Sequence, residues 1–229
     1  GSTANIAGRA LALTLGGDAA EYKGCLGTGV VKLAKDLSAA KTGLTEQQAK
    51  DEGFNVITVL TVSDDKAHYY PDSDIFITKL IADKATHKLL GAQIVGAGSV
   101  DKMVDIAVVG ITAGLKVEDF ITMDFSTAIH PFAAACGVLM NKISGRIESF
   151  TPMEYAEGKA KGYTLIDAHP TFTIPGATWF DLTKAAEEAE KYEKEAKLLL
   201  VCARGKRGYL IQNKLKALGF TGTRVLEGG

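Results

Sequence analysis

One loop near the end of the chain combines a cysteine with residue types that activate a sulfur atom. The apolar run 198–201 ends at Cys202, and four further candidate site residues follow it: Arg204, Gly205, Lys206 and Arg207. Backbone N–H groups of a glycine-containing loop and nearby cations favour a thiolate over a thiol. A thiolate is nucleophilic and can carry a bound sulfur atom. We therefore predict a reactive sulfur at Cys202, and the alternative is a buried apolar cysteine that ends a strand.

The flanking residues indicate how the fold would position this loop. The continuous apolar run before Cys202 is typical of a parallel strand that is covered on both faces. Further strands are expected at 162–168, which has Asp167 near its end, and at 224–229. A turn is expected at 174–177, a charged surface helix at 181–197 and a second helix at 207–220. Alternating strands and helices predict a small parallel sheet. Open sheets of this kind bind ligands at the carboxyl ends of their strands, which is where Cys202 would lie.

The residues before this region predict a different arrangement. Strands are expected at 26–33, 55–62 and 75–97, the last a hairpin that turns at 83–88, and helices at 5–15, 46–53, 100–115 and 130–143. Thr45 and Gln48 form a capping box, Ser99 is the expected cap of the third helix, and Pro131 stands early in the fourth. The polar stretch 146–162 predicts a linker.

Composition excludes several classes of protein. The 229 residues carry a formal net charge of −1, which gives no general attraction for nucleic acid, and no apolar run is long enough to span a membrane. The three cysteines and four histidines show no spacing typical of a disulfide framework or a metal site. We expect a reducing, cytoplasmic setting, with Cys25 and Cys136 as inert core residues.

The cysteine loop resembles the active-site loop of the rhodanese family, Cys-x-x-Gly-x-Arg-Ser. Cys202, Gly205 and Arg207 match this pattern, and Gly208 replaces the serine. The segments 165–168 ("LIDA") and 174–177 ("IPGA") resemble the opening of that family, with His169 in place of its arginine. The resemblance implies that Cys202 carries a persulfide, while the loop backbone, Arg204 and Lys206 hold the transferred sulfur and its anionic donor. Because the chain ends at Gly229, before the usual last helix, it implies an abbreviated domain.

The earlier residues resemble pyridine nucleotide-disulfide oxidoreductases. The segment 4–17 ("ANIAGRALALTLGG") is similar to a helix near the end of their flavin domain, and 22–54, 69–71 ("YYP") and 89–96 are similar to their dimerisation domain. The implied layout is the last flavin-domain helix at 1–19, a dimerisation domain at 20–145, a linker at 146–162 and a rhodanese-like domain at 163–229. The expected fold is thus an α+β dimerisation domain with an antiparallel sheet, followed by a small α/β domain with a parallel sheet.

This layout is that of coenzyme A-disulfide reductases and NADH-dependent persulfide or polysulfide reductases. It implies a homodimer whose parent enzyme uses FAD and NAD(P)H, held in N-terminal domains that this chain lacks, on a small sulfur-containing substrate. Ala4 and Asn5 would lie at the flavin edge. Because the chain has no dinucleotide-binding glycine turn, we expect it to hold neither cofactor alone.

The resemblance also implies three site residues from the dimerisation domain. His130, in a His-Pro pair, would supply an acid or base to the partner's active site, although Ala135 replaces the glutamate that orients it. Tyr69 and Tyr70 would face a disulfide substrate across the dimer. The alternatives are a local hydrogen bond at the start of the helix for His130 and strand-end packing for the tyrosines.

Three functions remain open from the sequence. The chain is part of a sulfur–sulfur reductase with a working sulfur-carrying cysteine, or a non-catalytic dimerisation module with a vestigial tail. The third is a stand-alone sulfurtransferase.

Overall fold

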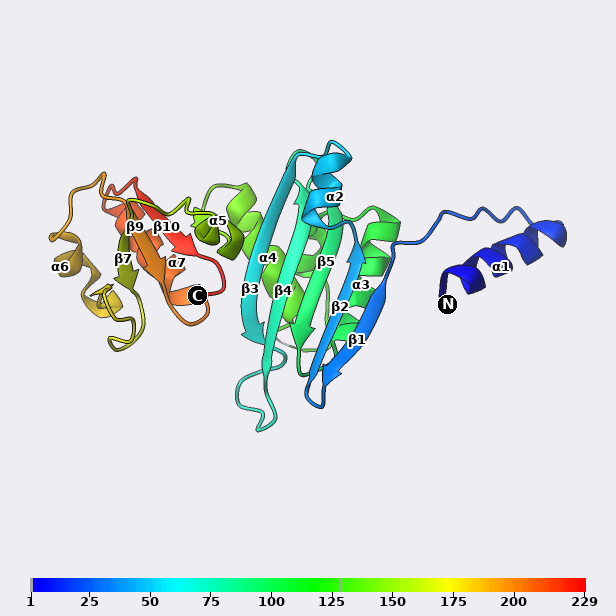
Figure 1. Ribbon diagram of the computed structural model, residues 1–229, viewed down its shortest axis with the longest axis horizontal. Coiled ribbons are helices and arrows are strands. Elements are labelled where there is room, and N and C mark those ends of the chain that lie inside the picture. Colours follow the sequence, from blue (N-terminus) through cyan, green and yellow to red (C-terminus); the bar gives the residue numbers. More distant parts are fainter. Residues whose placement is uncertain (1, 128) are drawn as a thin grey trace.

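Two sheets, each with its own core, make up most of the molecule. The computed structural model describes residues 2–127 and 129–229. A large antiparallel sheet lies in the centre, a smaller parallel sheet lies at one end, and the helix α1 (Ser2–Leu15) lies at the other (Figure 1). We call the first sheet with its helices the first unit, and the second sheet with its helices the second unit.

The first unit is the antiparallel α+β arrangement that the sequence predicts. Its strands are β1 (Gly29–Ala34), β2 (Leu37–Gly43), β3 (Val56–Asp64), β4 (Ile75–Asp83) and β5 (Leu89–Gly96). They pair antiparallel in the order β1-β2-β5-β4-β3. The helices α3 (Val100–Ala113) and α4 (Pro131–Ile143) cover one face of this sheet (Figure 1). Between sheet and helices lies a core that includes Phe76, Leu80, Ile94, Phe120, Phe132 and Leu139.

Local sequence signals explain several boundaries in this unit. The capping box of Thr45 and Gln48 begins α2 (Glu46–Asp51), as predicted. Pro131 occupies the first turn of α4. Proline lacks a backbone N–H, and an N–H at this position would have no acceptor within the helix, so no hydrogen bond is lost. Ser99 occupies the N-cap position of α3, as predicted, but its side chain makes no capping hydrogen bond. A 3-10 helix, η1 (Val117–Thr122), completes the unit.

The second unit is built on the predicted parallel sheet. Its strands are β6 (Ser149–Phe150), β7 (Thr164–Asp167), β8 (Thr178–Trp179), β9 (Leu198–Val201) and β10 (Thr223–Leu226), in the order β6-β10-β9-β7-β8. All four pairings are parallel. The helix α7 (Lys206–Ala217) packs Ile211 and Leu215 into a core shared with Ile166, Leu198 and Leu200. The strand β9 lies in the centre of the sheet and is buried on both faces, which confirms the prediction of a covered parallel strand before Cys202.

Two parts of the second unit differ from the sequence expectation. The charged helix predicted at 181–197 is wrong: the chain forms the 3-10 helix η2 (Leu182–Lys184) and the short helix α6 (Ala185–Ala189). Asp181 caps η2, and Tyr192 then packs against the core, which turns the chain toward β9. The stretch 146–162 contains both β6 and α5 (Pro152–Ala156), the latter begun by a capping box at Thr151. Because β6 pairs with β10, this stretch completes the second sheet.

The helix α1 stands apart from both units. It has no buried residue, and it exposes Ile6, Leu11, Leu13 and Leu15. Within the part of the chain that the structure describes, no helix is both long and apolar enough to cross a membrane. The same residues contain no cluster of histidine, cysteine and carboxylate side chains that could hold a metal ion.

Candidate functional site

Cys202 lies one residue beyond the carboxyl end of β9, where the sequence places it. The residue is a free cysteine and only 3% exposed. Its side chain belongs to the core of the second unit, together with Ile166 and Ile211. The sulfur thus sits at the ligand-binding edge of a parallel sheet but beneath its surface.

Glycines shape the loop that follows. Gly205 precedes α7 with φ +76°, a left-handed conformation that glycine adopts readily. A Cβ at Gly208 would lie 3.2 Å from both the Leu200 oxygen and Val225 Cγ1. The first turn of α7 therefore lies tightly against β9 and β10, which leaves little room for a side chain at residue 208.

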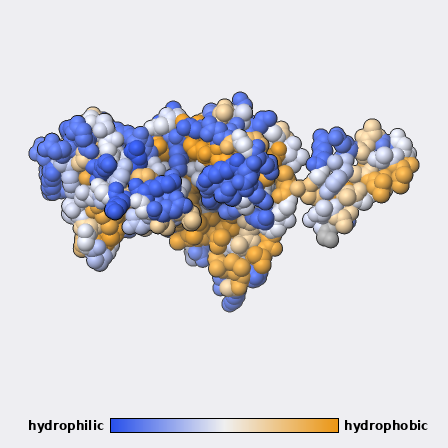
Figure 2. Space-filling view, turned by 45° about the horizontal axis from the view of Figure 1, so that its top comes forward, coloured by the Kyte–Doolittle hydropathy of each residue, from blue (hydrophilic) through white to orange (hydrophobic). Residues whose placement is uncertain are grey.

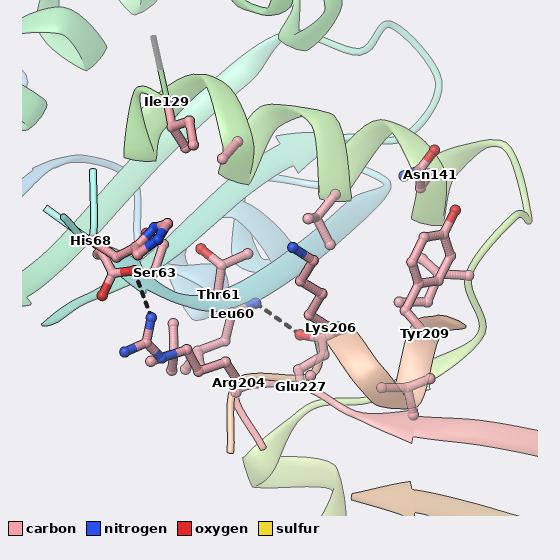
Figure 3. Close-up of a pocket in the computed structure, with 18 of the residues that line it drawn as sticks. Leu60, Thr61, Ser63, His68, Ile129, Asn141, Arg204, Lys206, Tyr209 and Glu227 are labelled. Atoms are coloured by element: carbon pink, nitrogen blue, oxygen red, sulfur yellow. Dashed lines mark hydrogen bonds and ion pairs between the residues drawn. The ribbon is translucent and has the colours of Figure 1, made fainter. Parts of the chain in front are cut away.

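The three cations of the loop point to three different places. Arg204 Nη1 pairs with Asp64 Oδ2 at the end of β3, at 2.7 Å. Arg207 Nε donates to the carbonyl oxygen of Ala168 at 2.8 Å. Lys206 points from α7 into a cleft between the two units (Figure 3). Among the described residues, no hydrogen bond or ion pair joins these side chains to Cys202.

Beside the cysteine loop, the end of β7 is held by a buried carboxylate. Asp167 is fully buried and accepts hydrogen bonds from the backbone N–H groups of His169, Thr173 and Ile174, at 3.0, 2.6 and 2.8 Å. His169 Nδ1 lies 2.7 Å from Asp167 Oδ1. Burial alone would raise the pKa of Asp167, but these hydrogen bonds outweigh it and hold the pKa well below its usual range. The ionised carboxylate thus shapes the loop 168–174 beside Cys202.

Asp167→Asn is expected to destabilise the folded chain by about 2 kcal/mol, because an amide N–H would face backbone donors. A carboxyl group whose pKa is lowered by folding adds its full contribution to the free energy of unfolding at pH values above its ordinary pKa of 3.8. This contribution is lost as the pH falls from 3.8 through the lower pKa of the folded state. Urea unfolding should therefore show the full difference between the two proteins at pH 6 and a smaller one below about pH 4. A difference that does not change with pH would contradict the assignment.

A cleft separates the cysteine loop from the first unit. Its volume is about 400 Å³. The walls come from β3, the segment 66–68, α4, residues 204–206, Tyr209 and the end of β10. Ile129 before α4 and Ile147 before β6 complete them, and the apolar lining includes Leu60, Val62, Val138 and Val225. Arg204, which lines the cleft (Figure 3), pairs there with Asp64, another of the lining residues.

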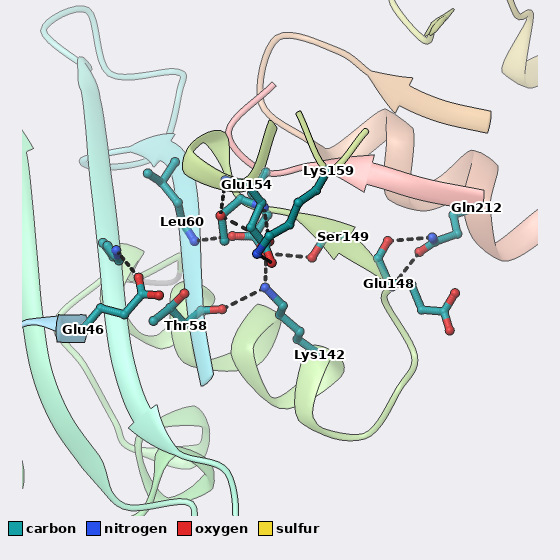
Figure 4. Close-up of polar contacts among 12 residues, drawn as sticks. Glu46, Thr58, Leu60, Lys142, Glu148, Ser149, Glu154, Lys159 and Gln212 are labelled. Carbon is teal, nitrogen blue, oxygen red and sulfur yellow. Dashed lines mark hydrogen bonds and ion pairs between the residues drawn. The ribbon is translucent and has the colours of Figure 1, made fainter. Parts of the chain in front are cut away.

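A buried ionic network holds the two units together at the floor of this cleft. Glu227, 5% exposed, follows β10. Its Oε1 accepts from Lys142 Nζ at 2.5 Å and from Ser149 Oγ at 2.6 Å, and its Oε2 accepts from the Leu60 N–H at 2.8 Å. Lys142 Nζ also donates to the Thr58 carbonyl oxygen at 3.0 Å (Figure 4). One carboxylate therefore joins four parts of the chain: the segment after β10, the strand β6, the helix α4 and the strand β3.

Sequence reasoning missed these contacts between units. Asp64, Lys142 and Glu227 are each an ordinary charged residue in sequence, and their partners lie far along the chain. The one available signal was a glutamate directly after an apolar strand, which is also common at exposed strand ends.

His130 is the residue that precedes α4, as predicted. Its ring stacks on Phe125, with 4.2 Å between centroids. Burial lowers its pKa, so the neutral imidazole is favoured at neutral pH. Nδ1 is buried and has no hydrogen-bond partner among the described residues, so the local hydrogen bond considered as an alternative is not seen there. Ala135, at the position of the orienting glutamate, is fully buried in the first core.

Tyr69 and Tyr70 lie on the loop between β3 and β4. They are 72% and 51% exposed, so they do not pack at a strand end. Their ring centroids are 5.0 Å apart, and His68 touches Tyr69 edge-on at 5.8 Å. The loop thus presents three aromatic side chains outward, next to the cleft that His68 lines.

The other two cysteines differ from each other. Cys136 is fully buried in the first core, and burial raises the pKa of its thiol far above the usual range. Cys25 is exposed, so its prediction as a core residue is wrong; its segment lies outside the strands and packs into neither core.

Iodoacetamide at pH 7.5 should therefore alkylate Cys25 and leave Cys136 unmodified in the folded chain, because alkylation needs an accessible thiolate. Peptide mass spectrometry measures both sites in one sample, and unfolding in urea should make Cys136 reactive. Equal modification of the two in the folded chain would contradict the burial of Cys136.

Comparison with known proteins identifies the first unit. The family model of the pyridine nucleotide-disulphide oxidoreductase dimerisation domain matches residues 33–137. Residues 33–137 belong to this domain family. The match runs from β1 into α4, so the dimerisation domain comprises the antiparallel sheet with the helices that cover it.

Two sulfur reductases are among the curated proteins to which the chain is similar. The chain is 39% identical over 129 residues to a CoA-dependent NAD(P)H sulfur oxidoreductase of Pyrococcus furiosus. It is 36% identical over 129 residues to an NAD(P)H coenzyme A polysulfide/persulfide reductase of Pyrococcus horikoshii. Each alignment covers 56% of this chain, and the chain spans 26% of the length of each relative.

Two solved structures match the dimerisation domain and the second unit together. An NAD-dependent persulfide reductase from A. fulgidus gives a TM-score of 0.87, and the reduced CoADR-RHD of Bacillus anthracis gives 0.90. Each match has 29% sequence identity and covers 99% of this chain and 42% of the other. An antiparallel sheet followed by a parallel α/β sheet is therefore an arrangement that these proteins share with the chain.

Proposed function

We propose that this chain is the C-terminal part of an NAD(P)H-dependent persulfide or disulfide reductase. In this proposal the dimerisation domain forms the subunit interface, and the second unit is a rhodanese-like domain with a sulfur-carrying cysteine. The observation that carries the proposal is the match to the A. fulgidus persulfide reductase over 99% of this chain, because it includes both units in one alignment. The position of Cys202 between a central parallel strand and a helix supports the second part.

The chemistry proposed for Cys202 is transfer of sulfane sulfur. Its thiolate attacks the outer sulfur of thiosulfate, the sulfur–sulfur bond of the donor breaks, and sulfite leaves with the bonding electron pair. The product is a persulfide on Cys202. Attack of an acceptor such as cyanide on the outer sulfur returns the thiolate and releases thiocyanate. No external oxidant or reductant is needed, since the two steps conserve both charge and electrons.

Reaction with a donor is the direct test. The chain with Cys25→Ser, which removes the exposed thiol, is incubated with thiosulfate, digested and examined by mass spectrometry. We expect Cys202 to gain the mass of one sulfur atom and Cys136 to gain none. A chain that takes up no sulfur at Cys202 would contradict the rhodanese assignment while leaving the dimerisation domain intact.

Flavin and nicotinamide belong to the proposed parent enzyme. Bound flavin would pass electrons from NAD(P)H to a disulfide or persulfide. Ala4 and Asn5 lie on α1, which has no buried residue, so the described residues do not enclose a flavin site around them. The residues present do not fit a flavin by themselves, and we derive no step through it. His130 and the exposed pair Tyr69 and Tyr70 remain candidates for a site shared with a second subunit.

A second candidate is a non-catalytic role for the second unit. Two observations favour it: Cys202 is only 3% exposed, and Arg204 is engaged by Asp64 of the dimerisation domain. In this case the second unit is a docked, vestigial domain. The third possibility, a stand-alone sulfurtransferase, requires sulfur transfer without an upstream reductase. A glycine-rich dinucleotide motif in the upstream coding sequence would exclude it.

The isolated chain is expected to form a homodimer. Apolar residues are exposed on the edge strand β1 (Val30, Val31 and Leu33) and on β4 (Ile75 and Ile77). Figure 2 shows apolar surface over the central part of the molecule and over α1. Exposed apolar surface that gathers on one part of a protein often marks a contact with a partner. Sedimentation equilibrium at micromolar concentration should give twice the chain mass, whereas a monomer at that concentration would contradict the proposal.

A further inference from the structure

The cleft between the two units has the composition of a binding site for a small ligand. Its volume of about 400 Å³ lies in the range of ligand pockets, roughly 300–1,000 Å³. Leu60 and Val62 from β3, Val138 from α4, and Ile129, which precedes α4, supply apolar walls on the side of the dimerisation domain. The second unit closes the opposite side with the start of α7 and the end of β10.

Among the described residues that line the cleft, every charged side chain except one has a charged partner. Arg204 pairs with Asp64 at 2.7 Å, Lys66 pairs with Asp72 at 2.6 Å, and Glu227 pairs with Lys142 at 2.5 Å. Lys206 has no hydrogen bond or ion pair to any residue in 2–127 or 129–229, and its side chain extends from the first turn of α7 into the cleft (Figure 3). The cleft therefore offers one uncompensated positive charge to a ligand.

We propose that this cleft binds a small amphipathic anion, with a flexible apolar chain and a single negative head group. The head group pairs with Lys206, and the chain lies along Leu60, Val62 and Val138. A neutral apolar ligand would leave the ammonium without a counterion, and a polyanion would meet Asp64 and Glu227. Tyr209 and Asn141, which lie at the far end from Arg204 in Figure 3, supply polar contacts beside the chain. This site goes beyond the proposed function, since it does not require Cys202 to react.

A series of alkyl sulfonates tests the proposal without any sulfur donor present. Butane-, hexane- and octanesulfonate are titrated into the chain below the concentration at which they form micelles, and binding is followed by calorimetry and by the rise in Tm. Burial of the alkyl chain predicts about fourfold tighter binding for each methylene, from roughly 0.8 kcal/mol per group. Octanol, which has the same chain and no charge, should bind markedly more weakly.

Matched variants locate the site. Lys206→Met keeps the length of the side chain and should weaken octanesulfonate at least about tenfold, because a charge-assisted contact is lost. Lys214→Met, which removes an exposed lysine from the last turn of the same helix, should leave binding unchanged. Ala134→Leu adds bulk on the cleft side of α4 at an exposed position and should also weaken binding. Circular dichroism confirms that each variant is folded.

Two results would overturn the proposal. One is the absence of saturable binding by the unmodified chain at millimolar octanesulfonate. The other is equal binding by the Lys206→Met and Lys214→Met variants, which would show only non-specific association with apolar surface. Sulfur transfer is measured separately, so neither result depends on whether Cys202 carries a persulfide.

Discussion

Replacing Cys202 with serine is expected to abolish transfer of sulfane sulfur from thiosulfate to cyanide, by a factor on the order of 10³ or more. A serine hydroxyl is not ionised at neutral pH and cannot form a persulfide, so both half-reactions are lost. The side chain is small and lies in the second core beside Ile166 and Ile211, so the substitution changes little volume. Thiocyanate formation measures the effect directly.

The matched control is Cys25→Ser, which removes the one exposed cysteine of the chain and should keep full activity. Residual transfer by the Cys202→Ser variant would assign the chemistry to another residue. If the unmodified chain itself makes no thiocyanate, the second unit is a non-catalytic domain, and the burial of Cys202 then explains why.

Glu227→Gln is expected to lower the free energy of unfolding by about 3 kcal/mol, because it leaves the Lys142 ammonium without its buried counterion. Both carboxylate oxygens accept hydrogen bonds, one from Lys142 and Ser149 and the other from the Leu60 N–H. A glutamine has a single acceptor oxygen, so either orientation of its amide places an NH₂ group against a donor. The lost charge and the unfavourable contact between two donors both lower the free energy of unfolding.

Urea unfolding measures this loss. The fluorescence of Trp179, the single tryptophan, reports on the second unit, and far-ultraviolet circular dichroism reports on both units. Glu193→Gln, an exposed substitution in the same unit, should change stability by less than about 0.5 kcal/mol. The double variant Lys142→Met/Glu227→Gln should lose less than the sum of the two single losses, since removing both charges leaves neither one unpaired. Strict additivity would contradict a direct ionic link.

Features with a short sequence range were predicted well. The capping box at Thr45, the hairpin of β4 and β5, and the position of Cys202 after β9 follow from residues within a few positions of one another. Their physical causes are local hydrogen bonds, alternating burial and a continuous apolar run. The helix predicted at 181–197 failed because helix propensity was outweighed by tertiary packing, in which Tyr192 turns inward.

The candidate site was harder to predict because its geometry depends on contacts between units. The three cations after Cys202 suggested one positive cluster around the sulfur. In the structure Arg204 is held by Asp64, Arg207 by the backbone at Ala168, and Lys206 points into the cleft. Where a long side chain points is set by partners distant in sequence, and no local pattern records them.

The pairing of β6 with β10 has a consequence for separating the two units. Cutting the chain at residue 163, the start of the rhodanese-like domain predicted from the sequence, would remove Ser149 and Phe150 from the sheet. The outer edge of β10 would then carry unpaired backbone N–H and C=O groups, which is a template for aggregation. A transplantable version of the second unit must therefore start upstream of Ser149, so its smallest cooperative piece reaches back into the stretch that joins it to the dimerisation domain.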